Sequence, residues 1–489
     1  MYRLGSAPLR QIPPSYRTLP HYVGRRCFIA SSRQADKPRL RSRSLEFKGQ
    51  TKKSRYNQVP SPSSYEINLE SSSPVWVERD ELYLLSQQRT LKLPFAYLRD
   101  TCLCSACKDQ HSKQRSFRTG DIPRNIRPRS IKWDGSQLSI KWVNDIPGYA
   151  SDHTSTWSVE ILHKPIADTH EKRYLNAPLK WSKKMMDQRQ HWISFDDYIN
   201  EDSKFAAAMQ SLRRTGLVFV DNVPESRDMV EKVATRMGPL RNTFYGSTFD
   251  VRTVPEAKNV AYTNQFLGFH MDLMYMNEPP GYQLLHCLEN SCSGGESLFA
   301  DTFRVANYMK KRYPEQYRLL CEQRLGYEYR HEDHIYHNKR PIFEIDPKTR
   351  ELLHVNYSPP FQSAIPSPDG KDHDAQSVGR FIAAIDLFTK LLNSKNGMFE
   401  FKLKPGVCVI FDNRRLVHAR RQFNASEGSR WLAGAYVDTD ALLSCFAVSQ
   451  RNHPRTWLRN NQELISRKPK ITQASHTIDP QEESGTKSD

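Results

Sequence analysis

Residues 268–273 read Gly-Phe-His-Met-Asp-Leu, and this short stretch decides how the large C-terminal part of the chain is interpreted. His270 and Asp272 are two positions apart, so on a β-strand both side chains point to the same face. An imidazole and a carboxylate that face one cavity suit a borderline divalent metal. The pattern therefore predicts two metal ligands on one strand.

A second stretch, residues 411–418, reads Phe-Asp-Asn-Arg-Arg-Leu-Val-His and follows an apolar segment that begins at Val407. His418 lies 146 residues beyond Asp272, so only tertiary folding can bring the two together. Two histidines and one carboxylate on one face leave three coordination positions open, as in the facial triad of non-haem Fe(II) oxygenases. We therefore predict an Fe(II) site formed by His270, Asp272 and His418.

Arg430 stands twelve residues beyond His418, in the segment Gly-Ser-Arg-Trp-Leu at 428–432. A strand at this point would aim the guanidinium into the same cavity. Taken alone, an arginine is more often a surface residue, but next to the metal motif it suits the far carboxylate of a dicarboxylic co-substrate. Ser297, which follows the Gly294-Gly295 pair, is expected to add its hydroxyl to that carboxylate.

The pattern around these motifs predicts a mainly β domain with flanking helices. Helices are expected over 203–216, 226–237 and 376–393, and an apolar strand over 217–220. The rest of 240–440 reads as short strands separated by Pro and Gly turns. This mixture favours a β-sandwich or jelly roll that helices support.

Three cysteines cluster upstream, as Cys102, Cys104 and Cys107. Three thiolates this close can converge on one zinc ion, although a redox pair or buried thiols would also explain them. His153 is the predicted fourth ligand, and His111 and His163 are rivals. With four protein ligands the zinc would be structural.

A predicted hairpin lies between the cysteines and His153. Ile131 and Trp133 alternate with polar residues, Asp134-Gly135 reads as a turn, and 138–142 alternate again. The hairpin would return the chain to the cysteines. The predicted zinc-binding domain covers residues 75–165.

The charge of the 489-residue chain is concentrated at its beginning. The formal charge is +18, and residues 1–58 hold 14 Lys and Arg against 2 acids, whereas residues 59–450 hold 51 against 47. Residues 1–35 contain six arginines and no acid, which favours a mitochondrial transit peptide over a disordered basic tail. Residues 36–74 read as a disordered linker and 467–489 as a disordered tail.

The cysteine cluster, H-x-D, His418 and Arg430 together resemble the carnitine-biosynthesis dioxygenases, and the γ-butyrobetaine dioxygenases more than the trimethyllysine dioxygenases. The resemblance spans about residues 75–445 and includes the stretch Gln-Leu-Leu-His-Cys at 283–287. It implies a double-stranded β-helix (jelly-roll) catalytic domain over 190–450 and a small β-rich zinc-binding N-terminal domain. It also implies a chain that is often mitochondrial and usually a homodimer.

The resemblance also implies roles for single residues. It assigns Fe(II) to His270, Asp272 and His418, and 2-oxoglutarate to Arg430 with Ser297. It assigns substrate recognition to Tyr245, Asn259, Tyr262 and Tyr436, with Asn356 as a loosely aligned further candidate for the substrate carboxylate.

Phe249 stands where the family carries a tryptophan of the substrate cage. A trimethylammonium group cannot donate hydrogen bonds and is best held by aromatic faces, so Tyr245, Phe249, Tyr262 and Tyr436 form a candidate aromatic box. Phenylalanine keeps a π-face but attracts a cation less strongly than tryptophan.

The implied reaction is the hydroxylation of γ-butyrobetaine to L-carnitine. Fe(II) is the implied cofactor, 2-oxoglutarate and O2 are the co-substrates, and succinate and CO2 are the co-products. Ascorbate is the expected reductant. Trimethyllysine hydroxylation is the first alternative, and an aliphatic-acid or sulfonate dioxygenase is the next. A zinc-dependent binding module with an inactive barrel is less consistent with the intact metal motif.

Two further classes of protein fit the sequence poorly. A nucleic-acid-binding protein would need basic charge on its folded part, whereas residues 59–450 are nearly balanced. A membrane-spanning protein would need about twenty consecutive apolar residues, and the sequence has no such run. The expected partners are therefore a small molecule and O2, and the expected location is mitochondrial, with the cytoplasm as alternative.

Overall fold

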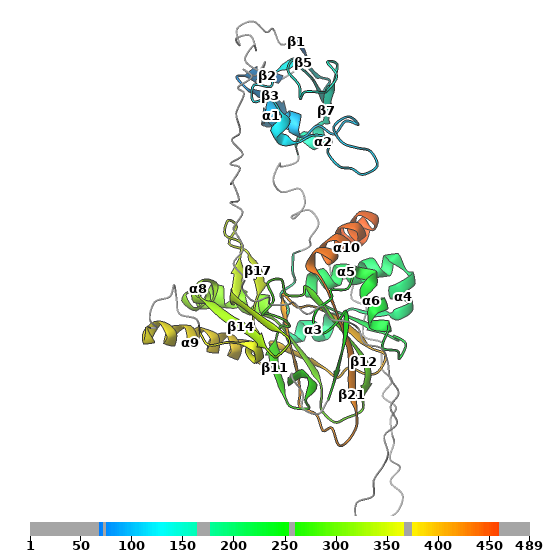
Figure 1. Ribbon diagram of the computed structural model, residues 1–489, viewed down its shortest axis with the longest axis vertical. Coiled ribbons are helices and arrows are strands. Elements are labelled where there is room, and N and C mark those ends of the chain that lie inside the picture. The colour runs from blue at the N-terminus through cyan, green and yellow to red at the C-terminus, as the bar shows by residue number, and fades with distance from the viewer. Residues whose placement is uncertain (1–67, 72–74, 164–176, 254–259, 366–373, 459–489) are drawn as a thin grey trace, which may run out of the picture. The chain divides into compact units, whose positions relative to one another are not determined.

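The computed structural model describes residues 68–71, 75–163, 177–253, 260–365 and 374–458 (Figure 1). The chain divides into two compact units, Met1–Leu162 and His163–Asp489. The predicted transit peptide at 1–35, most of the predicted linker at 36–74 and the predicted tail at 467–489 lie outside the described residues. Residues 68–71 of the predicted disordered linker instead form a strand that pairs with residues 130–133, so the linker prediction is wrong there. Among the described helices, none has the length and hydrophobicity that crossing a bilayer requires.

The N-terminal unit is a small β-rich domain. One sheet has the strand order β1-β5-β6-β7 and a second has the order β2-β3-β4. The bounds are β1 Asn68–Ser71, β2 Val75–Glu78, β3 Glu81–Ser86, β4 Arg89–Pro94, α1 Phe95–Asp100, a 3-10 helix Thr119–Asp121, β5 Pro128–Trp133, β6 Gln137–Trp142, β7 Thr154–Ser158 and α2 Val159–Leu162.

The hairpin predicted in this unit is confirmed by the antiparallel pairing of β5 with β6, in which Trp133 lies opposite Leu138. Gly135 has a φ of +93°, a left-handed conformation that glycine adopts at little cost. The Asp134 side chain accepts a hydrogen bond of 2.9 Å from the backbone N–H of Ser136 and so closes the turn. The apolar residues of both strands then face one core.

The C-terminal unit contains two antiparallel sheets that form a jelly roll. The larger sheet has the order β10-β21-β12-β19-β9-β8 and the smaller one β11-β20-β13-β18. Among the described strands of these two sheets, only β8 joins its neighbour in parallel. The bounds are β8 Trp192–Ser194, β9 Leu217–Asp221, β10 Thr248–Arg252, β11 Leu267–His270, β12 Tyr282–Asn290, β13 Ser297–Asp301, β18 Met398–Phe401, β19 Cys408–Asp412, β20 Leu416–Arg420 and β21 Arg430–Val437.

The larger sheet is buried on both faces, which explains the nearly continuous apolar run of β19. Val409 and Phe411 face the core that the two sheets share, whereas Cys408 and Ile410 face a second core under helices. Side chains alternate along a strand, so each face needs its own apolar set. The space between the two sheets is where an internal site can form.

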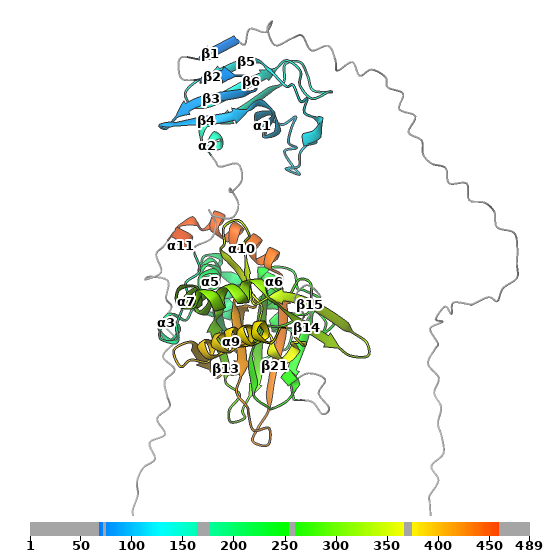
Figure 2. The same cartoon turned by 90° about the vertical axis from the view of Figure 1, so that its left-hand side faces the viewer.

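Helices cover the outside of the sheets. Helices α4, α5, α6, α10 and α11 pack on the outer face of the larger sheet, and α7, α8 and α9 pack together on the other side (Figures 1 and 2). The bounds are α3 Lys183–Arg189, α4 Phe195–Asn200, α5 Asp202–Thr215, α6 Met229–Met237, α7 Thr302–Arg312, α8 Pro314–Glu322, α9 Ala375–Leu392, α10 Thr439–Asn452 and α11 Pro454–Leu458.

Two β-hairpins and two short 3-10 helices complete the described part of this unit. The hairpins are β14 with β15 and β16 with β17. The bounds are a 3-10 helix Val260–Tyr262, β14 Arg324–Arg330, β15 Ile335–Pro341, β16 Phe343–Ile345, β17 Leu352–Val355 and a 3-10 helix Pro359–Phe361.

The helices differ from the prediction in two places. Helix α6 begins at Met229, three residues later than expected. The region 240–440 contains α7 and α8 in addition to the expected α9. Local signals for both were present, because the Asp301 side chain accepts a hydrogen bond from the N–H of Phe303 and Pro314 occupies the first position of α8.

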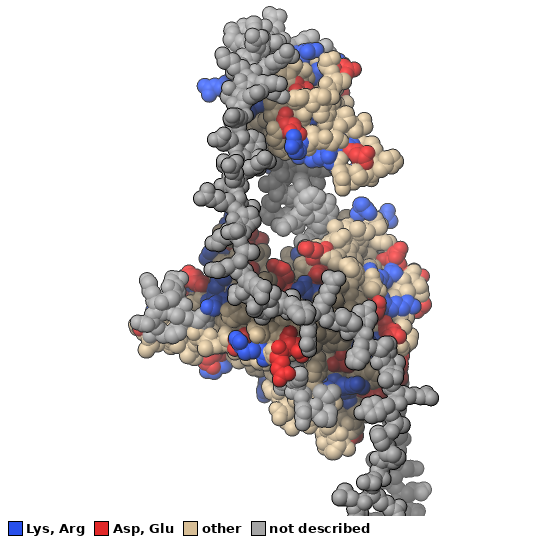
Figure 3. All heavy atoms as spheres, in the orientation of Figure 1, with Lys and Arg blue, Asp and Glu red and all other residues tan. Residues whose placement is uncertain are grey.

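Charged side chains on the face of the molecule seen in Figure 3 are of mixed sign, with lysines and arginines interspersed among aspartates and glutamates. The observation agrees with the near balance of charge over residues 59–450.

A buried ion pair ties β13 to β20 and to the start of the described part of this unit. The Arg415 Nη2 and Asp301 Oδ2 atoms are 2.8 Å apart, and both side chains are almost fully buried. The guanidinium also donates hydrogen bonds of 2.7 Å to the carbonyl oxygens of Arg214 and Leu179. Asp301 accepts a further bond of 3.0 Å from the backbone N–H of Trp181.

We predict that Asp301→Ala lowers the free energy of unfolding by about 3–5 kcal/mol, because it leaves the Arg415 charge buried without its carboxylate. Urea denaturation followed by tryptophan fluorescence measures the change. Asp386→Ala, which removes an exposed ion pair with Lys390, is the control and should leave the midpoint unchanged. Equal effects of the two variants would contradict this account.

Candidate active site and cysteine cluster

The structure brings His270, Asp272 and His418 together between the two sheets. Strands β11 and β20 pair with His270 directly opposite His418, and their ring centroids are 4.2 Å apart. Asp272 Oδ1 lies 3.3 Å from His270 Nε2 and 3.9 Å from His418 Nε2. The three donor atoms lie within 4.8 Å of one another, so they can hold one metal ion.

One detail differs from the prediction that His270 and Asp272 share a strand. Strand β11 ends at His270, and Asp272 lies in the turn that follows. Leu273 has a φ of +59°, so the chain reverses direction directly after the carboxylate. The carboxylate therefore faces the imidazoles because of a turn and not because of strand alternation.

Hydrogen bonds hold this turn and its ligands in place. The Asn413 side chain accepts a bond of 2.8 Å from the backbone N–H of Asp272 and donates one of 3.1 Å to its carbonyl oxygen. The Tyr436 hydroxyl donates to Asp272 Oδ2 at 2.7 Å. His270 Nδ1 donates to the carbonyl oxygen of Gly268 at 2.9 Å, which leaves its Nε2 free of a proton for a metal.

The electrostatics favour the protonation states that metal ligation needs. Burial opposes ionisation of Asp272, but the two adjacent imidazoles and the hydrogen bond from the Tyr436 hydroxyl hold its pKa well below the usual range. Burial, with a smaller contribution from His270, lowers the pKa of His418 to about 3. At neutral pH the site presents a carboxylate and a neutral His418 imidazole.

Arg430 begins β21 and is buried. Among the residues that the structure describes, no carboxylate pairs with its guanidinium, and its Nε makes no hydrogen bond. Burial lowers the pKa of Arg430 to about 10, so it remains charged at neutral pH. A buried cation without an anion is costly unless a ligand supplies the negative charge.

Two neighbours shape the space around Arg430. Gly295 has a φ of +73°, and a Cβ atom on it would lie 3.3 Å from the Arg430 side chain, so glycine keeps this approach open. Ser297, the first residue of β13, lines the same cavity as Arg430 and the metal cluster.

The predicted aromatic residues line this same cavity, which encloses about 840 Å³ including its opening to solvent. The Phe249 and Tyr436 rings stack with centroids 4.8 Å apart. Phe249 lies opposite Gly434 on β21, where a Cβ would lie 2.3 Å from the Phe249 ring. Gly434 therefore makes room for the ring.

Tyr436 and Arg430 lie on the same face of β21, six residues and roughly 20 Å apart. Tyr436 and the Arg430 cation therefore lie toward opposite ends of this strand.

The remaining predicted substrate residues have different positions. Tyr245 and Tyr262 line the cavity, and burial raises the pKa of Tyr262 to about 12. Asn259 lies outside the described residues. Asn356 does not line the cavity, and its side chain donates to the carbonyl oxygen of Pro341 at 2.8 Å.

Sequence reasoning missed several residues of the cavity. Gln283 belongs to a quoted motif but had no role assigned, and no local pattern marked several others, among them Tyr275, Pro360, Phe361 and Arg420. The histidines 331, 334 and 337 belong to the β14–β15 hairpin and form no metal cluster in the described part of the chain.

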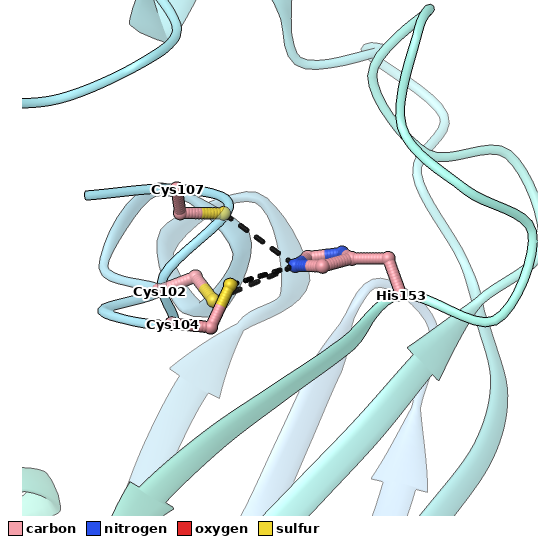
Figure 4. A group of neighbouring side chains, drawn as sticks. All are labelled: Cys102, Cys104, Cys107 and His153. Atoms are coloured by element: carbon pink, nitrogen blue, oxygen red, sulfur yellow. Dashed lines mark hydrogen bonds between the residues drawn. The ribbon is translucent and has the colours of Figure 1, made fainter. Parts of the chain in front are cut away.

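The cysteine cluster of the N-terminal unit forms a second candidate metal site (Figure 4). His153 Nε2 lies 3.8, 3.2 and 3.5 Å from the sulfur atoms of Cys102, Cys104 and Cys107, respectively. The rival ligands His111 and His163 are not part of the cluster. The four side chains point toward one another from two segments of the chain, as predicted.

Two residues that the sequence did not single out support this cluster. His153 Nδ1 donates to Asp145 Oδ2 at 2.6 Å, and Arg99 Nε donates to Asp145 Oδ1 at 2.5 Å. Arg99, which is fully buried, also contacts Cys107 Sγ at 3.2 Å. A carboxylate on the outer nitrogen of a histidine is the usual support of a metal-binding imidazole.

Comparisons with known proteins agree with both units. Residues 182–436 match the model of the family described as taurine catabolism dioxygenase TauD, TfdA family. Residues 83–163 match the family described as gamma-butyrobetaine hydroxylase-like, N-terminal.

Individual relatives are similar over most of the chain. Dioxygenase str8 from Strobilurus tenacellus is 30% identical over 369 residues, which cover 72% of this chain and 83% of that protein. Gamma-butyrobetaine dioxygenase from Homo sapiens is 31% identical over 365 residues, with coverage of 72% and 89%. The mitochondrial trimethyllysine dioxygenase of Rattus norvegicus is 28% identical over 370 residues, with coverage of 75% and 84%.

The family model that covers the metal cluster, together with relatives at this level of identity, shows what kind of protein this is. The chain belongs to the taurine catabolism dioxygenase TauD, TfdA family and is a 2-oxoglutarate-dependent dioxygenase.

Proposed function

We propose that this dioxygenase hydroxylates γ-butyrobetaine to L-carnitine, with 2-oxoglutarate converted to succinate and CO2. The observation that carries the proposal is one cavity lined by three metal-ligand side chains, an unpaired buried arginine and a group of aromatic faces. The γ-butyrobetaine dioxygenases among its relatives support the choice of substrate.

The donor set fits Fe(II). His270, His418 and Asp272 supply two nitrogen atoms and one oxygen, and such a triad leaves positions for co-substrate and O2. When bound, iron and 2-oxoglutarate supply the activation of O2 and the oxidative decarboxylation, with ascorbate as reductant. Tyr436 fixes one carboxylate oxygen of Asp272 through its hydroxyl, so the other oxygen is the one that faces the imidazoles.

Arg430 would bind the distal carboxylate of 2-oxoglutarate through its guanidinium, with the Ser297 hydroxyl beside it. Such a charge-assisted pair supplies the anion that Arg430 lacks among the described residues. Its position on β21 orients the co-substrate with its far end away from the aromatic residues.

The trimethylammonium group would lie against Tyr245, Phe249, Tyr262 and Tyr436. These faces attract a cation through the ring quadrupole and exclude water from it. The Phe249–Tyr436 stack already forms part of such a wall. Asn259 remains a proposed contact for the substrate. Trimethyllysine is the first alternative substrate, because trimethyllysine dioxygenases are also among the relatives.

We propose further that Cys102, Cys104, Cys107 and His153 bind one structural Zn(II). All four positions are filled by the protein, and Asp145 holds the imidazole, so the site has no place for a substrate.

We also propose that the protein is located in mitochondria and forms a homodimer. Residues 1–35 would direct import, and the name of the trimethyllysine relative includes the word mitochondrial. Residues 75–165 would be the zinc-binding domain and 190–450 the catalytic domain.

The decisive experiment compares succinate release with γ-butyrobetaine and with trimethyllysine. We expect γ-butyrobetaine to give the higher kcat/KM, with L-carnitine as product by mass spectrometry. His270→Ala should abolish succinate formation, because the metal loses a ligand. Turnover of trimethyllysine but not of γ-butyrobetaine would show that the proposed substrate is wrong. Succinate formation by His270→Ala would refute the proposed metal site.

We predict that Arg430→Met raises the KM for 2-oxoglutarate roughly 100-fold, because it removes the charged partner of the distal carboxylate. Steady-state kinetics at varied 2-oxoglutarate measure the change, and the KM for the substrate should change far less. Arg421→Met, which removes an exposed arginine paired with Glu400, is the control. An unchanged KM for 2-oxoglutarate would exclude Arg430 from the site.

We predict that Asp145→Asn lowers zinc affinity 10–100-fold, because a neutral amide supports the His153 imidazole less well than a carboxylate. Competition with a chromogenic chelator measures the affinity. Asp109→Asn, at an exposed aspartate of the same unit that bonds to Ser112, should leave it unchanged. If the purified protein contains no zinc, the proposed zinc site is excluded.

A further inference from the structure

The carboxylate of the proposed substrate has no assigned partner in the described part of the cavity. Asn356, the candidate that the sequence offered, is held by the carbonyl oxygen of Pro341 and lies 3.4 Å from Glu344 Oε2. It does not line the cavity. A carboxylate that enters an enclosed site must receive hydrogen bonds there, since its loss of hydration is otherwise too costly.

The two cations of the cavity are already committed. Arg420 donates hydrogen bonds of 2.9 and 2.7 Å to the carbonyl oxygens of Ala261 and Gln265. Arg430 is the proposed partner of 2-oxoglutarate. Among the described residues that line the cavity, a neutral donor is therefore the remaining uncommitted kind of partner for a substrate carboxylate.

Tyr275 offers such a donor. It follows the turn that carries Asp272, lines the cavity and is only 1% exposed. Its hydroxyl makes no hydrogen bond to any residue that the structure describes. Burial of a hydroxyl without a partner costs about 1–3 kcal/mol, so a ligand oxygen that satisfies it gains that free energy.

The surroundings fix the Tyr275 ring. Phe361, which also lines the cavity, packs edge-on with its ring centroid 5.1 Å away, and Tyr329 and Tyr336 lie at 5.4 and 5.9 Å. Burial, and then the nearby Tyr245, raise the pKa of Tyr275 well above the usual value, so the hydroxyl keeps its proton. The packing therefore orients the ring, and burial favours the protonated form of the hydroxyl.

We propose that Tyr275 is a specificity-determining residue whose hydroxyl donates a hydrogen bond to the carboxylate of the substrate. The inference rests on the proposed function and deepens it, because it restricts the substrate class to trimethylammonium compounds that carry a carboxylate. A compound with an apolar end leaves the hydroxyl unsatisfied and binds less well.

The test uses the full-length enzyme and two pairs of compounds. The first pair is γ-butyrobetaine and butyltrimethylammonium, in which a methyl group replaces the carboxylate. The second pair is trimethyllysine and its decarboxylated counterpart. Succinate release gives the KM for each compound, and the ratio within each pair measures recognition of the carboxylate.

Tyr275→Phe keeps the ring and removes the hydroxyl. We expect it to raise the KM for the carboxylate compound at least about tenfold and to leave the KM for its partner within about twofold. The KM for 2-oxoglutarate should stay unchanged. Tyr336→Phe is the matched control, because Tyr336 belongs to the same aromatic cluster but does not line the cavity.

The outcomes separate the two proposals. An unchanged ratio in Tyr275→Phe, or an equal change in Tyr336→Phe, overturns the role of Tyr275 while γ-butyrobetaine turnover still supports the proposed function. If Tyr275→Phe changes the KM ratio only for the trimethyllysine pair, the proposed substrate is refuted and the role of Tyr275 is supported. Turnover of none of the four compounds by the unmodified enzyme overturns both.

Discussion

The pairing of β11 with β20 is the constraint on which the active site depends. It sets His270 opposite His418, although the two residues are far apart in the sequence. Because the two histidines lie on directly paired strands, the backbone ladder fixes the separation of their Cα atoms. The jelly roll can therefore prepare two of the three metal ligands before any metal arrives.

The third candidate ligand, Asp272, is positioned by hydrogen bonds to its backbone and not by strand pairing. Asp272 lies past the end of β11, and Asn413 binds its backbone N–H and carbonyl groups. Asn413 lies between β19 and β20, so the turn is tied to the strand that carries His418. All three donor residues are therefore anchored at the β11–β20 edge of the smaller sheet. A displacement of that edge would move the three residues together.

The sequence could predict the residues that meet at the candidate metal site because a short motif carries each of them. It could not predict that Asp272 leaves the strand, since the reversal depends on the left-handed Leu273 and on a contact with the distant Asn413. Tyr275 and the Arg99–Asp145 pair were missed for a related reason. Their roles come from burial and tertiary partners, which no local spacing encodes.

Charge decides which ligand goes where in the cavity. Arg430 is a buried cation at one end of β21, and the stacked rings of Tyr436 and Phe249 lie toward the other end. A dianionic co-substrate is attracted to the arginine and to a metal held by Asp272, whereas a trimethylammonium group is repelled by both and attracted by aromatic faces. If the two exchanged places, each would leave a buried charge uncompensated. Electrostatics therefore orders the two ligands in the proposed reaction, and contacts such as the Tyr275 hydroxyl have only to choose among substrates that already lie in the right orientation.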